Sequence, residues 1–479
     1  MSSNVTTPTS ASTGQGSLGI INIILLVIAA TGPVSVLLTN ISLAIGFGNG
    51  IGVPAVYLML GVIYLLFSFG FSAMGTRITQ NDSYFRYITQ GVGQHAGASA
   101  AFIGLICYSS LLLALYALVG QFTSDFVTIK TGLEIPWWIY AAIVLVIANI
   151  LSIKNIEFNG KILGIMMIIE LVVISLFYIF SAKDIYHSAR SYSFPFDANT
   201  VFSTGLGASI VLLINCFFGF EAVAIYAKST KNPHKTMNVA LIFAILAIVA
   251  IFSFSAWMFI NVIGADKVVA MVQNDPAGIW FELFATIMHP LAADFLSLIL
   301  LTSLFSATFS FHNIVSRYLA MLSGNKLLPQ KFGTLHIKEK TPSFANNFIT
   351  LIMMACVILF GCIMQLDALR VAMVSASPTS LGIVFVQLMT NFAIIRYFRM
   401  TSNDVNIFAR LIAPLLSSVL FIILIGVMIS NLDSITGVQS LLNYLIPTFV
   451  SITALGGYIY SRKLEKTKKE YALSVKEAV

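Results

Sequence analysis

Charged side chains are scarce in this chain. Asp, Glu, Lys and Arg make up 9% of the 479 residues, against the roughly 25% that is usual in soluble proteins. Apolar residues make up 58% of the chain, and the mean hydropathy is +0.92. No stretch is polar and long enough to form a separate soluble domain. The composition therefore excludes a soluble protein and predicts an integral membrane protein embedded in a lipid bilayer.

Motifs of metal, nucleotide and nucleophile chemistry are also lacking. The sequence has no His/Cys/Asp cluster with metal-ligand spacing, no glycine-rich phosphate loop ending in Lys-Ser/Thr, and no nucleophile elbow. We therefore expect no enzyme activity, no cofactor and no bound metal. The four cysteines all fall inside apolar runs, which predicts buried free thiols rather than a disulfide framework. They are Cys107, Cys216, Cys356 and Cys362.

Apolar runs long enough to cross a bilayer recur along the whole chain. Residues 1–17 are uncharged and rich in Ser and Thr, which predicts a disordered tail without the basic start of a signal peptide. We expect a short surface helix within 264–291 and an interfacial helix at 81–97. About twelve spans are predicted, at 18–45, 53–75, 97–126, 136–152, 158–181, 201–228, 236–263, 292–322, 344–364, 371–396, 407–430 and 441–461.

Basic residues are distributed unevenly between the predicted loops. With the N-terminus placed inside, 21 of the 26 Lys and Arg residues lie at inner loops and inner helix ends. Such a bias sets the orientation of membrane proteins and predicts that both termini are cytoplasmic. The net charge of +7 is then explained by topology, and no nucleic-acid partner is expected.

Two of the predicted spans are interrupted near their middle. The first contains Thr31-Gly32-Pro33, and the sixth contains Gly219 followed by Glu221. Lipid cannot satisfy the backbone groups that such a break frees, so breaks persist where they face protein or a water-filled cavity. Two interrupted spans in the two halves of a chain are typical of secondary transporters. The alternatives are a simple proline kink at Pro33 and a helix-capping carboxylate at Glu221.

Several single residues within the spans are candidates for chemistry. Glu170 lies in the middle of the fifth span, where a charge costs roughly 2.5–3.5 kcal/mol, so it is a candidate proton carrier or a neutral packing group. His312 in the eighth span is a candidate ligand or a hydrogen-bonded core histidine. Tyr108, Phe217 and Phe311 are aromatic candidates to cover a substrate, although such residues often only pack. The hydroxyls of Ser303, Ser306 and Thr308 are expected to bond to their own helix.

Four motifs in order along the chain resemble the amino acid–polyamine–organocation superfamily of permeases. They are GFEAVAIYAKSTKNPHKT, FHNIVSRYLAMLSGNKLLP, TPSFAN and SPTSLGIVFVQLMTNFAIIRYFR. The resemblance implies an all-α membrane fold with a LeuT-like five-plus-five inverted repeat over residues 18–396 and discontinuous first and sixth helices. Two additional helices at 397–461 and a basic cytoplasmic tail at 462–479 follow. It also implies alternating access around a site at mid-depth.

The resemblance also implies a set of site residues. Glu221 would be an inner gate, and Glu170 falls near the place where some relatives carry a lysine that replaces sodium. The expected gating or coupling residues are Glu170, Glu221 and His312. The expected substrate-binding residues are Thr31, Gly32, Pro33, Val34, Ser35, Tyr108, Asn215, Cys216, Phe217, Gly219 and Phe311.

The sequence departs from the family pattern in two places. ATGPVS stands where many amino acid permeases carry Gly-Ser-Gly, as in the branch that includes amine carriers, and Lys228, Ser229 and Thr230 replace the usual acidic residues. We expect a proton-coupled symporter of an amino acid or small amine in the plasma (inner) membrane, with half-helix amides holding a substrate carboxylate. A polyamine or cationic amino acid carrier or exchanger, using Glu221 as cation partner, is the first alternative. A channel or a membrane scaffold is the more remote one.

Overall fold

The computed structural model describes residues 20–78, 83–154, 156–188, 192, 195–219, 233–336, 338–339, 341–401, 405–436 and 440–477. Most of these residues are helical, and no strand occurs among them. Within the described part of the chain, nine helices are long and apolar enough to cross a membrane. Three shorter apolar helices accompany them, at Trp137–Ser152, Leu206–Phe217 and Gly278–Ile287. The prediction of an all-helical membrane protein is therefore confirmed. The predicted tail at 1–17, Glu221 and 228–230 lie outside the described residues.

The first predicted span is divided into short segments. Helices α1 (Ile20–Thr31) and α2 (Pro33–Val36) are separated by Gly32, and a π-helical turn, η1 (Leu37–Ile41), leads into α3 (Ser42–Phe47). The apolar run at 53–75 forms α4 with the predicted bounds, Val53–Gly75. The remaining helices of the first half are α5 (Ser83–Gly91), α6 (Gln94–Thr131), α7 (Trp137–Ser152) and α8 (Ile156–His187).

The second half of the chain begins differently from the prediction. The predicted sixth span starts at 201, but α9 (Ala198–Val201) ends there and α10 (Leu206–Ile214) starts a new helix that leads into the 3-10 turn η3 (Asn215–Phe217). Gly205, at φ +92, caps the start of α10 and separates the two helices. The rest of the half follows: α12 (Pro233–Ile263), α13 (Val268–Asn274), α14 (Gly278–Ile287), α15 (Pro290–Gly324), α16 (Ser343–Val357) with the π turn η5 (Ile358–Ile363), and α17 (Ala368–Thr401).

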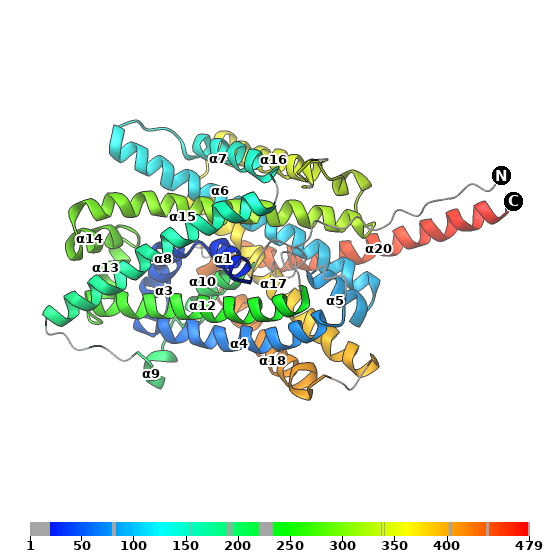
Figure 1. The fold of residues 1–479 in the computed structure, drawn as a ribbon, viewed down its shortest axis with the longest axis horizontal. Helices are drawn as coiled ribbons and strands as arrows, with labels where there is room; N and C mark the ends of the chain where they lie inside the picture. The colour runs from blue at the N-terminus through cyan, green and yellow to red at the C-terminus, as the bar shows by residue number, and fades with distance from the viewer. Residues whose placement is uncertain are drawn as a thin grey trace.

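One further apolar helix and one long helix of mixed composition follow. They are α18 (Ala413–Ser430), preceded by the π turn η6 (Phe408–Ile412), and α20 (Leu445–Glu477). The predicted twelfth span ends at 461, yet α20 continues and projects from the body, at the end opposite α13 and α14 (Figure 1). The helix continues because the segment after Ser461 is rich in Lys and Glu, which are good helix formers in water.

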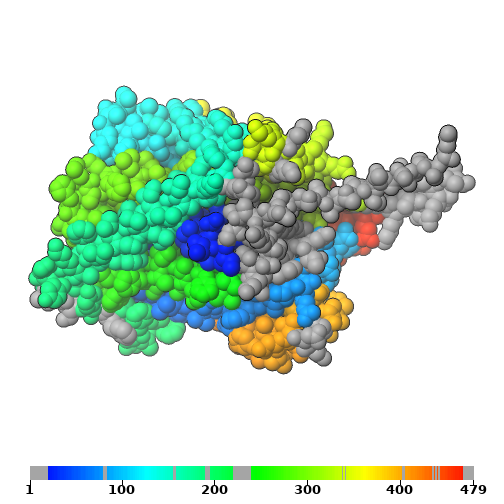
Figure 2. Space-filling view, in the orientation of Figure 1, coloured from blue at the N-terminus to red at the C-terminus, as the bar shows by residue number. Residues whose placement is uncertain are grey.

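Helix α1 lies in the middle of the bundle. It packs against α8, α12 and α15 (Figure 1), and Figure 2 shows it between α8 and α12 on one face of the molecule. Helices α6, α7 and α16 lie on one side of it, and α4 and α18 on the other (Figure 1). The broken segment is therefore surrounded by helices, which provide the protein environment that a break requires.

The structure also tests the predictions for the segment 81–97 and for the four cysteines. The segment expected to be interfacial forms α5, which packs against α6 and α17 with Tyr84, Tyr87 and Ile88 fully buried. It is therefore part of the core. All four cysteines are free, as expected, but only Cys107 and Cys216 are buried: Cys356 is half-buried, and Cys362 is exposed, which contradicts the prediction. Cys362 lies in η5, and most residues of that turn face away from the protein.

Candidate functional site

The first break depends on a glycine in the left-handed region. Gly32 has φ +59 and ψ 70, and Pro33 follows it as the first residue of α2. A Cβ atom added to Gly32 would lie 2.7 Å from the Ser35 Oγ and 3.1 Å from the backbone oxygen of Ser303. Glycine is therefore required by its backbone conformation and by the close approach of α15.

The backbone amides freed by this break have acceptors inside the protein. Pro33 has no N–H, and the amide of Val36 donates to the backbone oxygen of Gly32. The Val34 amide donates to the carboxyl of Glu170 at 3.1 Å, and the Ser35 amide donates to Ser303 Oγ at 3.1 Å. In this conformation the first turn of α2 is therefore capped by α8 and α15 rather than open to a substrate carboxylate.

Glu170 connects three elements at the first break. It is fully buried on α8 and accepts hydrogen bonds from the Val34 amide, from Ser303 Oγ at 2.7 Å and from Ser306 Oγ at 3.3 Å. An acidic group at the N-terminus of a half-helix is favourably placed against the helix dipole. Ser306 also bonds to its own helix, as expected of these hydroxyls, whereas the Ser303 hydroxyl is directed to Glu170. Glu170 is not among the residues that line the cavity described below.

The second predicted break lies beside the first: the chain leaves the helical conformation before Gly219, and residues 220–232 lie outside the described residues. Gly219 follows η3 with φ +91, and a Cβ atom placed on it would lie 3.3 Å from the ring of Phe311 and 3.9 Å from Ala30 Cβ. Ala30 belongs to α1 and Phe311 to α15, so residues from both broken segments meet at one point. The sequence-based hypothesis required this proximity.

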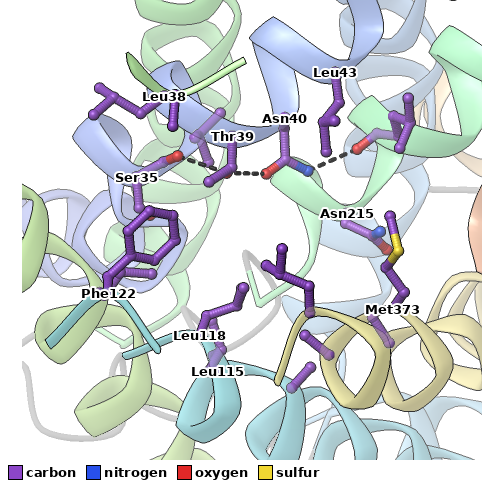
Figure 3. Close-up of a pocket in the computed structure, with 18 of the residues that line it drawn as sticks. Ser35, Leu38, Thr39, Asn40, Leu43, Leu115, Leu118, Phe122, Asn215 and Met373 are labelled. Atoms are coloured by element: carbon purple, nitrogen blue, oxygen red, sulfur yellow. Dashed lines mark hydrogen bonds between the residues drawn. The ribbon is translucent and has the colours of Figure 1, made fainter. Parts of the chain in front are cut away.

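A cavity of about 520 Å³ adjoins the two breaks. Figure 3 shows residues of the first broken segment on one side of it and Leu115 and Leu118 of α6 on the opposite side. Five of the predicted substrate-binding residues line this cavity: Thr31, Ser35, Asn215, Cys216 and Phe311. The volume is within the range of small-molecule sites, about 300–1,000 Å³.

The other predicted binding residues do not line the cavity. Gly32, Pro33, Val34 and Gly219 form the backbone of the two breaks. Phe217 packs on the other side of its segment, where its ring stacks on Tyr64 with centroids 4.8 Å apart. Tyr108 of α6 packs against Phe311, with centroids 6.1 Å apart, and makes no hydrogen bond through its hydroxyl among the described residues.

The polar side chains that the first broken segment contributes to the cavity wall are neutral. The hydroxyls of Thr31, Ser35 and Thr39 donate to carbonyls of their own helix at 2.6 to 2.7 Å. Asn40 donates through Nδ2 to the backbone oxygen of Leu212 at 2.8 Å, which ties η1 to α10 (Figure 3). These four side chains therefore offer a substrate acceptors more readily than donors.

Asn215 is the exception in this wall. Its Oδ1 accepts a hydrogen bond from Ser380 at 2.7 Å, which fixes the orientation of the amide. Its Nδ2 makes no hydrogen bond among the described residues, and the side chain lines the cavity. Asn215 therefore presents a donor that a carboxylate or carbonyl oxygen can use.

His312 lies in a separate network. Its Nδ1 pairs with the hydroxyl of Tyr116 at 2.8 Å, and its Nε2 pairs with Asn346 Oδ1 at 2.9 Å. The ring is fully buried and does not line the cavity. Its surroundings fit a core histidine that holds α6, α15 and α16 together.

Most of the apolar wall was not predicted. Leu111, Leu115, Leu118 and Phe122 line the cavity from α6, at spacings of four, three and four residues, and Met373 faces it from α17. Such spacing places them on one helix face. The spacing was visible in the sequence, but apolar stripes that face lipid or core have the same spacing.

Comparison of the sequence with known proteins identifies the protein family. The sequence model of the family described as amino acid permease matches residues 22–469. An uncharacterized transporter of Bacillus subtilis, YdgF, is 25% identical over 319 residues, which are 62% of this chain and 65% of the relative. The serine/threonine exchanger SteT of the same organism is 22% identical over 304 residues, 62% of this chain and 67% of the relative. These two alignments thus span about two thirds of the relatives. The aromatic amino acid transport protein AroP of Escherichia coli is 22% identical over 440 residues, 88% of this chain and 91% of the relative.

Proposed function

The chain belongs to the amino acid permease family, and we propose that it is a secondary transporter that moves an amino acid across the membrane by alternating access. The observation that carries the proposal is the meeting of two helix breaks beside one cavity. Gly32 and Gly219 both adopt positive φ, and Phe311 lies against Gly219 while lining the cavity. Broken helices beside a shared cavity are how secondary transporters build a substrate site within the membrane.

The packing of helix pairs supports a five-plus-five repeat. The second and seventh predicted spans (α4 and α12) pack together, as do the third and eighth (α6 and α15) and the fourth and ninth (α7 and α16). Two halves related by a pseudo-two-fold axis bring such equivalent helices together. We assign the transport core to residues 18–396, two additional spans to 397–461 and a basic cytoplasmic tail to 462–479, within twelve spans in total.

The basic residues predict the orientation of the chain in the membrane. With that orientation, the position of the cavity indicates to which side of the membrane this conformation is open. Asp275 and Asp367, in loops expected outside, line the cavity, so it opens outward. On the inner side the rings of Phe311, Tyr108 and Tyr318 are packed in series, with centroids 6.1 and 6.0 Å apart. We assign this aromatic series the role of inner closure, with Glu221 as a further gate beyond it, and both termini to the cytoplasm.

Substrate contacts follow from the polar groups beside the breaks. The Asn215 Nδ2 donates to the substrate carboxylate, and the hydroxyl and carbonyl oxygens around Thr31 and Ser35 accept from its ammonium group. The names of the relatives, which include a serine/threonine exchanger and an aromatic amino acid transport protein, do not select among amino acids.

Proton coupling is assigned to Glu170. As a carboxylate it accepts all three of its hydrogen bonds, from Val34, Ser303 and Ser306. A proton on Oε2 would face the Val34 amide, which can only donate, and would displace that contact, whereas a proton on Oε1 can be donated to Ser306 Oγ, whose own proton goes to the Ser303 carbonyl. The protonation state of Glu170 is thereby linked to the geometry of the first break, whereas His312 keeps a packing role.

Reconstitution into liposomes tests the function. We expect saturable uptake of labelled amino acids, accelerated by an inwardly directed proton gradient. Phe311→Ala opens the inner closure and abolishes accumulation, whereas Phe392→Ala, at a side chain of α17 that is 52% exposed, leaves it intact. Conductance without saturable uptake indicates a channel, and the absence of both in folded protein indicates a scaffold; either result contradicts the proposal.

A further inference from the structure

The wall of the cavity is apolar along two neighbouring helices, α6 and α17. On α6, Leu115, Leu118 and Phe122 are half-buried and line the cavity, although they belong to a tightly packed helix. Met373 faces the cavity from α17 and is also half-buried (Figure 3). The accessible part of each of these side chains is therefore the part that a bound molecule can cover.

The first broken segment and α10 extend this apolar surface. Leu38 and Leu43 line the cavity from the outer half of the first span, and Val211 and Leu212 line it from α10. The polar groups among them are hydroxyls and amides, and the charged side chains that line the cavity, within the described residues, are the solvent-exposed Asp125, Asp275 and Asp367. A charged substrate side chain held there would lose its hydration without gaining a counter-charge.

Three carboxylates line the cavity only at its exposed end. Asp125, Asp275 and Asp367 are solvent-exposed, and each accepts a local hydrogen bond. Asp275 accepts from the Gly278 amide at 2.8 Å, and Asp367 accepts from the Arg370 amide at 3.1 Å, as helix-capping groups do. Their negative charge attracts the ammonium group of any amino acid and repels acidic ones, but their contacts are made at the mouth rather than at depth.

We propose that the substrate is a neutral amino acid with a large apolar side chain, of the size of leucine, isoleucine or phenylalanine, rather than a cationic or acidic one or a polyamine. This inference rests on the function proposed above and specifies its substrate class. The side chain lies against Leu115, Leu118, Phe122 and Met373, and the charged α-groups lie at the breaks near Asn215. Selectivity comes from the burial of methylene groups, which is worth about fourfold in affinity for each one.

Competition for uptake in proteoliposomes tests the class directly. We expect leucine, isoleucine and phenylalanine to inhibit labelled leucine uptake at far lower concentrations than serine, and lysine, glutamate and putrescine to have no effect. If uptake is saturable but lysine, glutamate or putrescine is preferred, the substrate class is wrong and the transport function stands. If folded protein takes up no amino acid or amine, both proposals fail.

One substitution tests whether the apolar wall selects the substrate by its side chain. Leu118→Ala removes three carbon atoms from the wall, and we expect at least about a tenfold loss of apparent affinity for leucine with a much smaller change for alanine. Leu416→Ala is the matched control, since Leu416 lies on α18 and is 46% exposed on the outside of the protein. Equal losses for leucine and alanine in Leu118→Ala overturn the inference. Should that variant fail to fold, the competition series on the unsubstituted protein still decides.

Discussion

The carboxyl of Glu170 accepts the backbone amide of Val34 at 3.1 Å, across 136 positions of sequence. This contact joins the middle of α8 to the first turn of the half-helix that follows the break. The Ser303 hydroxyl completes it, because it donates to Glu170 and accepts from the Ser35 amide. The buried acid therefore caps the first turn of α2 directly, and we propose that the geometry of α2 depends on the protonation state of the carboxyl.

Replacement of the acid by its amide tests this dependence. In Glu170→Gln the side chain keeps an acceptor oxygen for Val34 but can no longer bind and release a proton. We expect pH-dependent uptake to fall by about tenfold or more, while membrane insertion is unchanged. A tenfold fall corresponds to about the free energy of one charge-assisted hydrogen bond. The measurement is labelled uptake into proteoliposomes with and without a proton gradient.

The matched control for this variant is Glu282→Gln. Glu282 is an exposed acid on α14, outside the cavity wall, and its replacement should leave the pH profile unchanged. If Glu170→Gln retains the pH-dependent uptake of the unsubstituted protein, Glu170 is not the coupling residue.

Removal of the Ser303 hydroxyl should cost stability. In Ser303→Ala the buried Ser35 amide loses its acceptor, and an unsatisfied buried donor costs about 1–3 kcal/mol. We expect a lower melting temperature in thermal unfolding of the purified protein. Ser297→Ala is the comparison, because Ser297 lies on the same helix and bonds only to the carbonyl of Ala293 in its own helix. Identical melting temperatures for the two variants would show that the cap on α2 contributes no stability.

Much of the fold could be predicted because local composition determines it. The span at 53–75 is an uninterrupted apolar run between a glycine-rich turn and Arg77, and α4 has these bounds. Both breaks were predicted from small residues, since Gly32 and Gly219 stand where an apolar run must leave the helical conformation. The extension of α20 beyond the predicted membrane segment was missed, because hydropathy marks where lipid ends and not where a helix ends.

The site was harder to predict, because it depends on contacts between distant segments. Nothing local to Glu170 indicates that its partner is the amide of Val34. Leu118 of α6 and Ile147 of α7 belong to similar apolar stripes, yet one lines the cavity and the other is 43% exposed on the outside. Only the packing of the whole bundle distinguishes a wall of the cavity from a surface that faces lipid.

His312 should behave differently from Glu170. Its replacement in His312→Ala leaves the buried Tyr116 hydroxyl and Asn346 side chain without one partner each, at about 1–3 kcal/mol per group. We expect a lower melting temperature and, in the protein that remains folded, an unchanged dependence of uptake on pH. A shifted pH profile with a normal melting temperature would reverse this assignment and place His312 in the coupling mechanism.

Gly32 offers the most direct test that the break is required. Gly32→Ala places a Cβ on a residue with φ +59, where it would lie 2.7 Å from Ser35 Oγ and 3.1 Å from the backbone oxygen of Ser303. The left-handed backbone alone costs about 1–2 kcal/mol for a residue other than glycine. We therefore expect a lower melting temperature and loss of uptake.

The control is Gly426→Ala, in the regular helix α18, where the added Cβ meets no heavy atom within 4 Å. Alanine in a helix is favoured over glycine by about 0.5–1 kcal/mol, so this variant should melt at the same temperature or higher and transport normally. The two substitutions are chemically identical and are predicted to change stability in opposite directions. Normal melting and normal uptake in Gly32→Ala would mean that a continuous first helix also supports transport, and the role assigned to the break would then be wrong.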